Sequence, residues 1–212
     1  MAEGPVQGQD IGPVGVSAGD GSQAEAQAET QAPAAPSPTP GAQPPAGGVA
    51  GPVARELAAE VLRLLTRGGH TVATAESLTG GLVAAALTDV PGASSAFRGG
   101  VVAYATELKA EALGVDVALL KAHGPVYAPV AAAMAEGVRK RLQATIGVAT
   151  TGVAGPDPQN GYPPGTVHIA VSLADDTVVR TIALAGTRDE IRRLTVERVL
   201  GLLLGRLREE CP

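Results

Sequence analysis

The sequence is poor in cysteine and in aromatic residues. Its 212 residues include a single cysteine, Cys211, so neither an internal disulfide nor a multi-cysteine metal site can form. Tryptophan is absent and aromatic residues make up only 2% of the chain, whereas hydrophobic residues make up 45%. A folded core must therefore be built from valine, leucine, isoleucine and alanine.

Signals for membranes, secretion and metals are also lacking. No apolar run is long enough to span a bilayer, and the N-terminus has neither the basic start nor the apolar stretch of a signal peptide. We therefore expect a cytoplasmic protein that does not bind membranes. No group of His, Asp and Glu has the spacing of metal ligands, so no metal site is predicted.

The first fifty residues contain no Lys, Arg, His or aromatic residue and are crowded with Pro, Gly, Ala and Gln. Such a segment buries too little apolar surface to offset chain entropy, which predicts a disordered acidic tail over residues 1–51. Five of the 21 acidic residues lie there, so the net charge of -5 belongs to the tail and the remainder is balanced. A balanced domain argues against nucleic-acid binding, which needs a concentrated basic face.

Residues 52–209 have the length of one domain, and their hydrophobic periodicity alternates between helix and strand. Helices are predicted over residues 53–67, 79–89, 106–113 (with Thr106 as its N-cap), 117–122, 129–142 and 188–207. Strands are predicted over residues 71–74, 97–105, 145–151, 165–173 and 177–184. Alternating elements followed by a hairpin predict an α/β fold, a three-layer α/β/α sandwich with a mixed central sheet.

Hydroxyl side chains follow several of the predicted strands. Ser77, Tyr104 and Thr151 each lie at or near the carboxyl end of a strand. Because ligand sites in open α/β sheets form at these ends, we expect the three hydroxyls to converge on one crevice.

The segment 75–81, AESLTGG, is the strongest candidate for chemistry. It reads as the end of a strand, a tight polar turn and a helix start, where unpaired backbone amides favour anions and oxyanions. Ser77 is the candidate nucleophile, although the pattern alone also fits a simple helix cap. Glu76 either bonds a substrate or braces the turn. The neighbouring Thr79, Gly80 and Gly81 are candidate substrate-binding residues.

A serine needs a base to become a nucleophile, and the pattern does not identify one. His70 lies in a turn, His123 before a loop and His168 inside a strand, so none of the three histidines stands out as the base. No Gly-x-Ser-x-Gly elbow is present either. Lys109 could lower the pKa of a hydroxyl group, or it could be an ordinary exposed helix lysine. Tyr104 could relay a proton or simply pack at the strand end.

The segment 152–157, GVAGPD, follows another buried strand. It lacks the Gly-Lys-Ser/Thr ending of a P-loop and the Gly-x-Gly-x-x-Gly pattern of dinucleotide sites. The amides of Gly152 and Gly155 could still hold a phosphate or an oxyanion, and Asp157 could bind a ribose hydroxyl or cap the turn. Arg188, unfavourable at a helix N-terminus, fits better with an anion bound nearby.

Taken together, several motifs of this chain resemble the CinA C-terminal domain family, in order and over nearly all of residues 52–209. They are AESLTGG at 75–81, FRGGVVAY at 97–104, HGPV at 123–126, TTGVAGPD at 150–157 and GTV at 165–167. The resemblance implies a nicotinamide-nucleotide amidohydrolase. Such an enzyme deamidates nicotinamide mononucleotide to nicotinic acid mononucleotide and ammonia, without metal or organic cofactor, and the resemblance also suggests a homodimer.

The resemblance assigns roles residue by residue. Ser77 matches the nucleophile, Tyr104 and Thr151 match assisting hydroxyls, Lys109 matches the lysine after the tyrosine, and Arg188 matches the arginine expected near the phosphate. The chain departs from the family pattern at Leu78, at residues 105–107 and at Tyr127, none of which is the proposed nucleophile. Two other readings stay open: a non-catalytic nucleotide-binding module, and a scaffold whose acidic tail recruits a partner.

Overall fold

The computed structural model describes residues 51–210. The tail predicted over residues 1–51, apart from Gly51, and Cys211 therefore lie outside the described residues. Within the described range no helix has both the length and the apolarity needed to cross a membrane.

The elements follow the predicted order of helices and strands. The helices are α1 (Pro52–Gly68), α2 (Leu82–Thr88), α3 (Thr106–Leu113), α4 (Val117–His123), α5 (Ala128–Arg141) and α6 (Arg188–Glu210), with a short 3-10 helix, η1, at Ala93–Ser95. The strands are β1 (Val72–Glu76), β2 (Phe97–Val102), β3 (Ile146–Gly152), β4 (Thr166–Ser172) and β5 (Thr177–Ala183).

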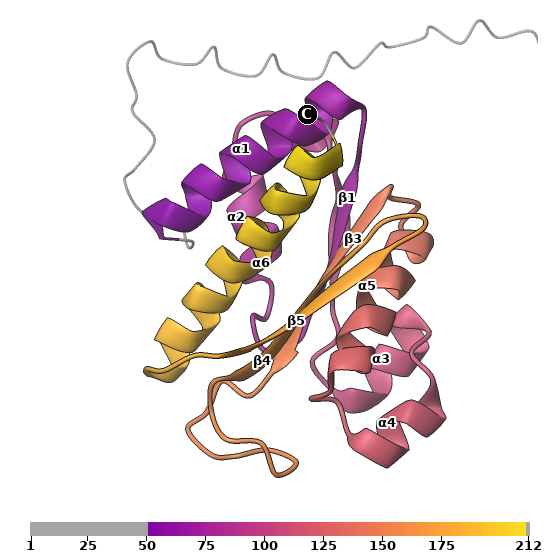
Figure 1. The fold of residues 1–212 in the computed structure, drawn as a ribbon, viewed down its shortest axis with the longest axis vertical. Coiled ribbons are helices and arrows are strands. Elements are labelled where there is room, and N and C mark those ends of the chain that lie inside the picture. The colour runs from indigo at the N-terminus through magenta and orange to yellow at the C-terminus, as the bar shows by residue number, and fades with distance from the viewer. Residues whose placement is uncertain (1–50, 211–212) are drawn as a thin grey trace, which may run out of the picture. The chain divides into compact units, whose positions relative to one another are not determined.

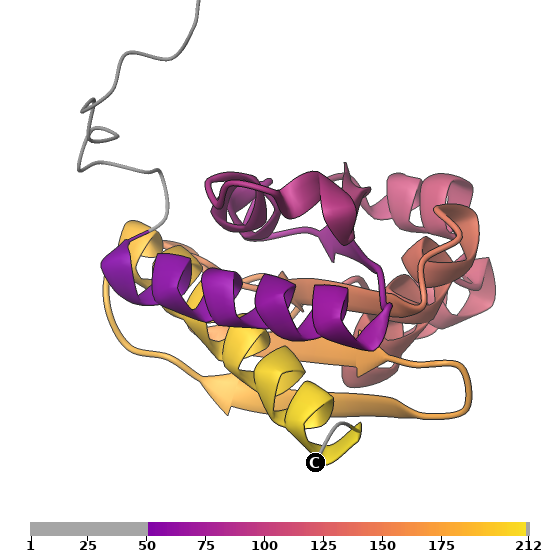
Figure 2. The same cartoon turned by 90° about the horizontal axis from the view of Figure 1, so that it is seen from above.

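The strands form one mixed sheet in the order β2-β1-β3-β4-β5. β1 runs parallel to both β2 and β3, whereas β4 is antiparallel to β3 and to β5. Helices α1, α2 and α6 cover one face, and α3, α4 and α5 cover the other (Figures 1 and 2). The predicted three-layer sandwich with a mixed sheet is therefore confirmed.

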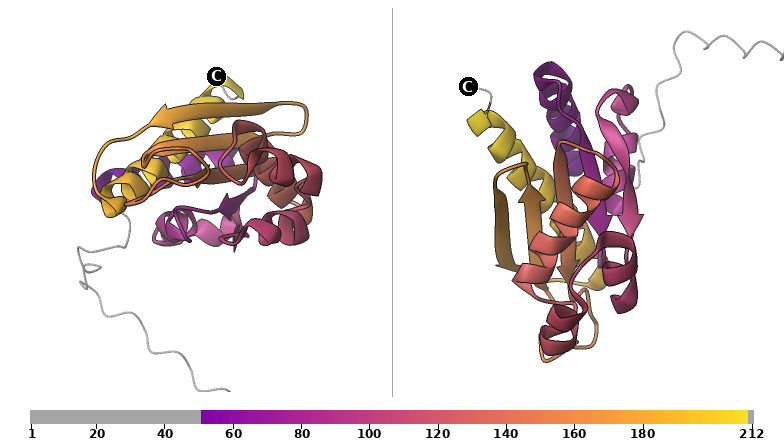
Figure 3. Two further views of the ribbon diagram at one scale, coloured as in Figure 1. Left: turned by 90° about the horizontal axis from the view of Figure 1, so that it is seen from below. Right: turned by 90° about the vertical axis from the view of Figure 1, so that its right-hand side faces the viewer.

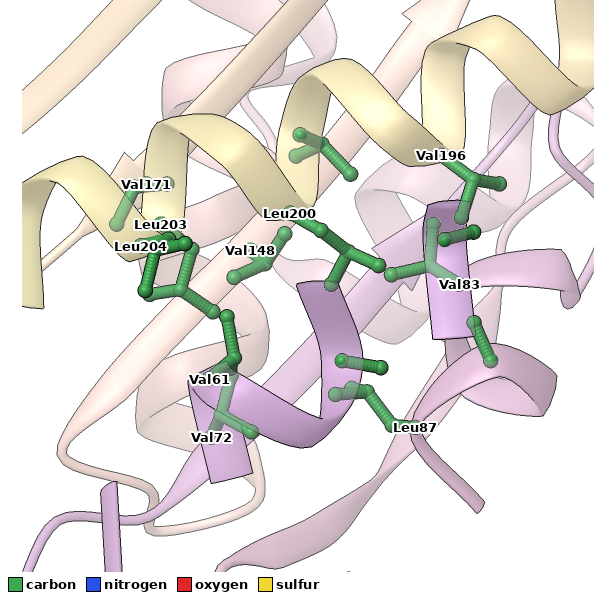
Figure 4. Close-up of a cluster of buried hydrophobic side chains, with 14 of the residues drawn as sticks. Val61, Val72, Val83, Leu87, Val148, Val171, Val196, Leu200, Leu203 and Leu204 are labelled. Atoms are coloured by element: carbon green, nitrogen blue, oxygen red, sulfur yellow. The ribbon is translucent and has the colours of Figure 1, made fainter. Parts of the chain in front are cut away.

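The face under α1, α2 and α6 holds the larger core. Branched side chains of the inner strands, such as Val72 and Val148, pack there against leucines of α6, including Leu200 and Leu203, as Figure 4 shows. Each of these four side chains is at least 98% buried. Burying a side chain of this size contributes about 1.5–3 kcal/mol, so this face supplies much of the driving force for folding.

The opposite face is lined by very small residues. Ala73 and Ala75 of β1 and Ala149 of β3 belong to the core under α3, α4 and α5, and Gly147 of β3 is the register partner of Ala73. A Cβ atom placed on Gly147 would lie 1.9 Å from the backbone oxygen of Ala135, so the α5 backbone approaches the sheet directly. The right-hand view of Figure 3 shows α5 lying over the sheet.

Two predicted helix starts are wrong, for different reasons. The helix predicted from Thr79 begins at Leu82, because Gly80 and Gly81 have φ values of 59° and 98°, which a right-handed helix does not allow. Thr106 is the first residue of α3, and Ala105 occupies the N-cap position without a side-chain hydrogen bond. The turn after β1 is therefore longer than the sequence pattern predicts.

We expect Gly147→Ala to destabilise the protein by about 3 kcal/mol, because the added methyl group collides with the α5 backbone. The matched control is Gly201→Ala in α6, where a Cβ atom meets nothing within 4 Å. That change should stabilise the protein by about 0.5–1 kcal/mol. Urea unfolding followed by circular dichroism measures both values, and equal stabilities of the two variants would contradict the close packing of α5.

Candidate active site

Ser77 directly follows the last residue of β1 and lies at the carboxyl end of the parallel strands. Its backbone N–H donates to the Thr150 carbonyl of β3 (3.0 Å), which ties the turn to the neighbouring strand. Its carbonyl accepts the N–H of Gly80 (3.1 Å), which closes a four-residue turn before α2. The backbone of the candidate nucleophile is therefore held at both its N–H and its carbonyl.

A buried carboxylate braces this turn. Glu76 is 1% exposed, and its two carboxylate oxygens accept backbone N–H groups of Gly81 (2.9 Å), Val83 (3.0 Å) and Ala84 (2.8 Å). These donors lie at the start of α2, where a helix favours negative charge. Of the two roles left open for Glu76, the structure supports the brace. The N-terminal amides expected to bind an anion are thus already occupied.

The glycines and threonine of the motif do not line the cavity described below, so their predicted contact with substrate stays a prediction. Thr79 is fully buried, and its hydroxyl shares a 2.7 Å hydrogen bond with that of Thr150. The amide of Gly81 is held by Glu76, and the amide of Gly80 by Ser77. The three residues shape the turn, and the structure gives them no surface in the cavity.

Lys109, a residue of α3, contacts Ser77 with the end of its side chain. Its side chain is fully buried, and its Nζ lies 3.2 Å from Ser77 Oγ, 2.7 Å from the carbonyl of Ala103 and 3.5 Å from that of Tyr104. Burial lowers the pKa of Lys109 from 10.5 to about 8, although the nearby Glu107 carboxylate acts in the opposite direction. The alternative of an exposed helix lysine is therefore excluded.

A cavity of about 120 Å³ opens beside Ser77 and Lys109. It brings together all the predicted catalytic residues and several of the predicted substrate-binding ones: Ser77, Tyr104, Lys109, Thr151, Gly152, Gly155, Asp157 and Arg188. Further lining residues that the sequence pattern does not single out are Leu78, Pro125, Val126, Val153, Ala154 and Gln159. None of the three histidines lines this cavity, so among the described residues Lys109 is the basic side chain beside the serine.

Thr151 lies deep in the cavity and is 1% exposed. Its hydroxyl donates a 2.8 Å hydrogen bond to the carbonyl of Pro125, in the loop between α4 and α5. Because a threonine hydroxyl has one proton, Thr151 presents lone pairs rather than a donor to the cavity. Thr151 also ties the loop wall to β3. To act as an assisting hydroxyl that donates a hydrogen bond to a ligand, Thr151 would need to turn its hydroxyl away from Pro125.

Arg188 and Tyr104 form the mouth of the cavity. Arg188, the first residue of α6, donates from Nη1 to the carbonyl of Gly155 (2.6 Å) and from Nη2 to the Tyr104 hydroxyl (2.8 Å). The start of α6 is stabilised by reciprocal bonds between Thr187 and Glu190, the arrangement of a capping box. An exposed guanidinium group held at the rim can meet an anionic ligand, as the sequence position of Arg188 suggests.

Two of the six lining residues that the sequence did not single out, Pro125 and Val126, form one wall of the cavity. Their signal was present in HGPV at 123–126, where a Gly-Pro step between two helices indicates a tight loop. The pattern gives no reason to bring that loop to β3, because the approach depends on α5 packing on the small residues of the sheet.

We expect Glu76→Gln to destabilise the protein by about 3 kcal/mol, because the amide cannot accept three N–H groups and turns an NH₂ group toward donors. Glu56→Gln, at an exposed position of α1, is the matched control and should change stability by less than about 0.5 kcal/mol. Chemical denaturation checks both variants. Equal stability of Glu76→Gln and the unchanged protein would show that the brace contributes nothing.

Comparison with known proteins places this geometry in a family. A sequence profile of the CinA C-terminal domain matches residues 54–207. A CinA-like protein of Frankia casuarinae is 58% identical over 147 residues, which cover 69% of this chain and 34% of that protein. The chain spans between 34% and 38% of the length of three curated relatives that it matches.

Solved structures agree with the sequence match. A CinA superfamily protein from Klebsiella pneumoniae has a TM-score of 0.72 at 29% identity, covering 74% of this chain and 98% of its own. The competence/damage inducible protein CihA from Agrobacterium tumefaciens has a TM-score of 0.72 at 35% identity, covering 75% and 98%. With the profile spanning most of residues 51–210 and these structures sharing the fold, the chain belongs to the CinA C-terminal domain family.

Proposed function

We propose that the chain is a serine amidohydrolase that deamidates nicotinamide mononucleotide to nicotinic acid mononucleotide and ammonia. The observation that carries the proposal is the contact between Lys109 Nζ and Ser77 Oγ (3.2 Å), with the pKa of Lys109 lowered to about 8 by burial. A lysine that is partly neutral near physiological pH can take the proton of an adjacent serine, which a normal lysine cannot. The family resemblance supplies the substrate.

The proposed reaction has two steps. Neutral Lys109 accepts the proton of Ser77 as Oγ attacks the carboxamide carbon, and the same proton then goes to the nitrogen as the C–N bond breaks and ammonia leaves. Lys109 then takes a proton from a water molecule that attacks the resulting ester. As the ester bond breaks, Lys109 gives this proton to the oxygen of Ser77. The backbone N–H of Leu78, which has no acceptor among the described residues, is a candidate donor to the tetrahedral oxyanion.

The rim of the cavity suits the rest of such a nucleotide. The volume of about 120 Å³ suits a pyridine carboxamide rather than a whole nucleotide, so ribose and phosphate would lie at the mouth. Arg188 would bind the phosphate, and Asp157, which also lines the cavity, would bind a ribose hydroxyl or the cationic ring. Tyr104, hydrogen-bonded to Arg188, would help to order this end and remains a candidate for proton transfer. A homodimer remains part of the proposal.

Removing the nucleophile gives the first test. Ser77→Ala should lower the rate of ammonia release from nicotinamide mononucleotide by about 10⁴-fold or more, because no oxygen remains to attack the amide. Ser94→Ala, at an exposed position of η1, should keep the full rate. Both variants should show the unchanged circular dichroism spectrum. Full ammonia release by Ser77→Ala, or nucleotide binding without turnover by the unchanged protein, would contradict the proposal and favour a non-catalytic binding module.

The pH dependence tests the base. Because the proton acceptor is neutral Lys109, kcat/KM should rise about tenfold per pH unit below about pH 8 and level off above it. Lys109→Arg keeps a charged side chain that stays protonated at these pH values, so it should lose both the activity and the rise. Lys121→Arg, exposed on α4, is the matched control. A profile that is flat across pH 8 in the unchanged protein would exclude Lys109 as the base.

A further inference from the structure

A second arginine of α6 contacts the turn that carries Ser77 without lining the cavity. Arg192 lies one helical turn after Arg188 and therefore on the same helix face. Its Nε donates to the carbonyl of Leu78 (3.1 Å) and its Nη2 to the carbonyl of Thr79 (3.0 Å). Its Nη1 lies 3.8 Å from a carboxylate oxygen of Asp189. All three guanidinium nitrogens thus have a protein partner.

These contacts complete the restraint of the turn. Glu76 holds the amides on its helix side, and Ser77 and Gly80 close it by their own hydrogen bond. The carbonyls of Leu78 and Thr79 are held by Arg192. Because a peptide carbonyl and the following N–H lie in one plane, holding these carbonyls fixes the 78–79 and 79–80 peptide units, the first of which begins one residue after Ser77. The turn is restrained by a buried anion from one side and a cation from the other.

Gly80 shows how closely the guanidinium group packs on the turn. A Cβ atom at Gly80 would lie 3.4 Å from Arg192 Nη2, which is van der Waals contact. Two carbonyls of consecutive residues match the forked donors of arginine, whereas a lysine ammonium group would act as a single point donor. The side chain of Arg192 is 26% exposed, so water screens these bonds only in part.

We propose that Arg192 is a positioning residue: it holds the Leu78–Thr79 backbone so that Ser77 Oγ stays aligned with Lys109. The inference rests on the proposed serine mechanism. Arg192 does not line the cavity, so it acts on the reaction only through the turn. Small misplacements of a nucleophile are costly, because proton transfer and attack both require the reacting atoms within hydrogen-bond reach.

The first arm of the test is kinetic and uses the full 212-residue chain. Arg192→Met should lower kcat by about 100-fold while KM stays within about twofold, since binding groups are untouched and alignment is lost. The midpoint of the pH profile should remain near 8, because Lys109 keeps its surroundings. Arg192→Lys should recover part of the loss through one hydrogen bond, and it keeps the test decisive if Arg192→Met does not fold. Arg193→Met, at the exposed neighbouring position, is the matched control.

The second arm does not depend on the nucleotide. A small alkyl fluorophosphonate reacts as Ser77 Oγ forms a bond to phosphorus, fluoride leaves and the serine proton goes to Lys109; intact-mass spectrometry follows the labelled protein. Labelling should slow about as much as kcat in Arg192→Met and stay unchanged in Arg193→Met. Labelling and kcat equal to those of Arg193→Met, or a rise in KM alone, would overturn the inference. If the unchanged protein is labelled at Ser77 but releases no ammonia, slower labelling of Arg192→Met still supports the positioning role, and the proposed substrate is wrong.

Discussion

The hydrogen bonds from the start of α2 to the Glu76 carboxylate are the interaction on which the site depends. A fully desolvated carboxylate is costly unless its lone pairs are satisfied, and here three backbone N–H groups and the positive end of a helix satisfy them, with no basic side chain of residues 51–210 in contact. The same bonds fix where α2 begins and how the chain turns between β1 and α2. Ser77 is the residue directly after Glu76, so the brace and the proposed nucleophile cannot move independently.

Lys109 is a buried cation, and like the buried Glu76 anion it is held by backbone groups. Its ammonium group is buried against backbone carbonyls, and among the described residues it forms no ion pair. A contacting carboxylate would raise its pKa and keep it protonated, whereas carbonyl dipoles leave desolvation as the dominant effect. The site thus holds the carboxylate of Glu76 and the amine of Lys109 through two separate sets of backbone partners. Their separation is what lets the amine exist partly as a base.

The order of the elements and the mixed sheet were predictable because the hydrophobic period changes clearly from helix to strand along the chain. The rule that sites form at strand ends also predicted that Ser77, Tyr104 and Thr151 share one crevice, and all three line the cavity. The burial of Lys109 was not predictable from the pattern, since a lysine early in a helix is usually exposed. Glu76 and Arg192 bind backbone groups. Because every residue type has a backbone carbonyl, and all but proline an N–H, the sequence does not indicate which residues they contact. The helix start at Leu82 was missed because the sequence pattern does not reveal that Gly80 and Gly81 adopt positive φ values.

The alanine and glycine face of the sheet has a consequence for the dimensions of the cavity. α5 approaches β3 closely because Gly147 and Ala149 carry almost no side chain, and α5 begins just after Val126, a residue of the cavity wall. Thr151, on the same strand, is hydrogen-bonded to Pro125 of that wall. The spacing between α5 and the sheet therefore sets the width of the cavity. Side chains that never meet a ligand would determine, through this spacing, how large a ring the protein admits.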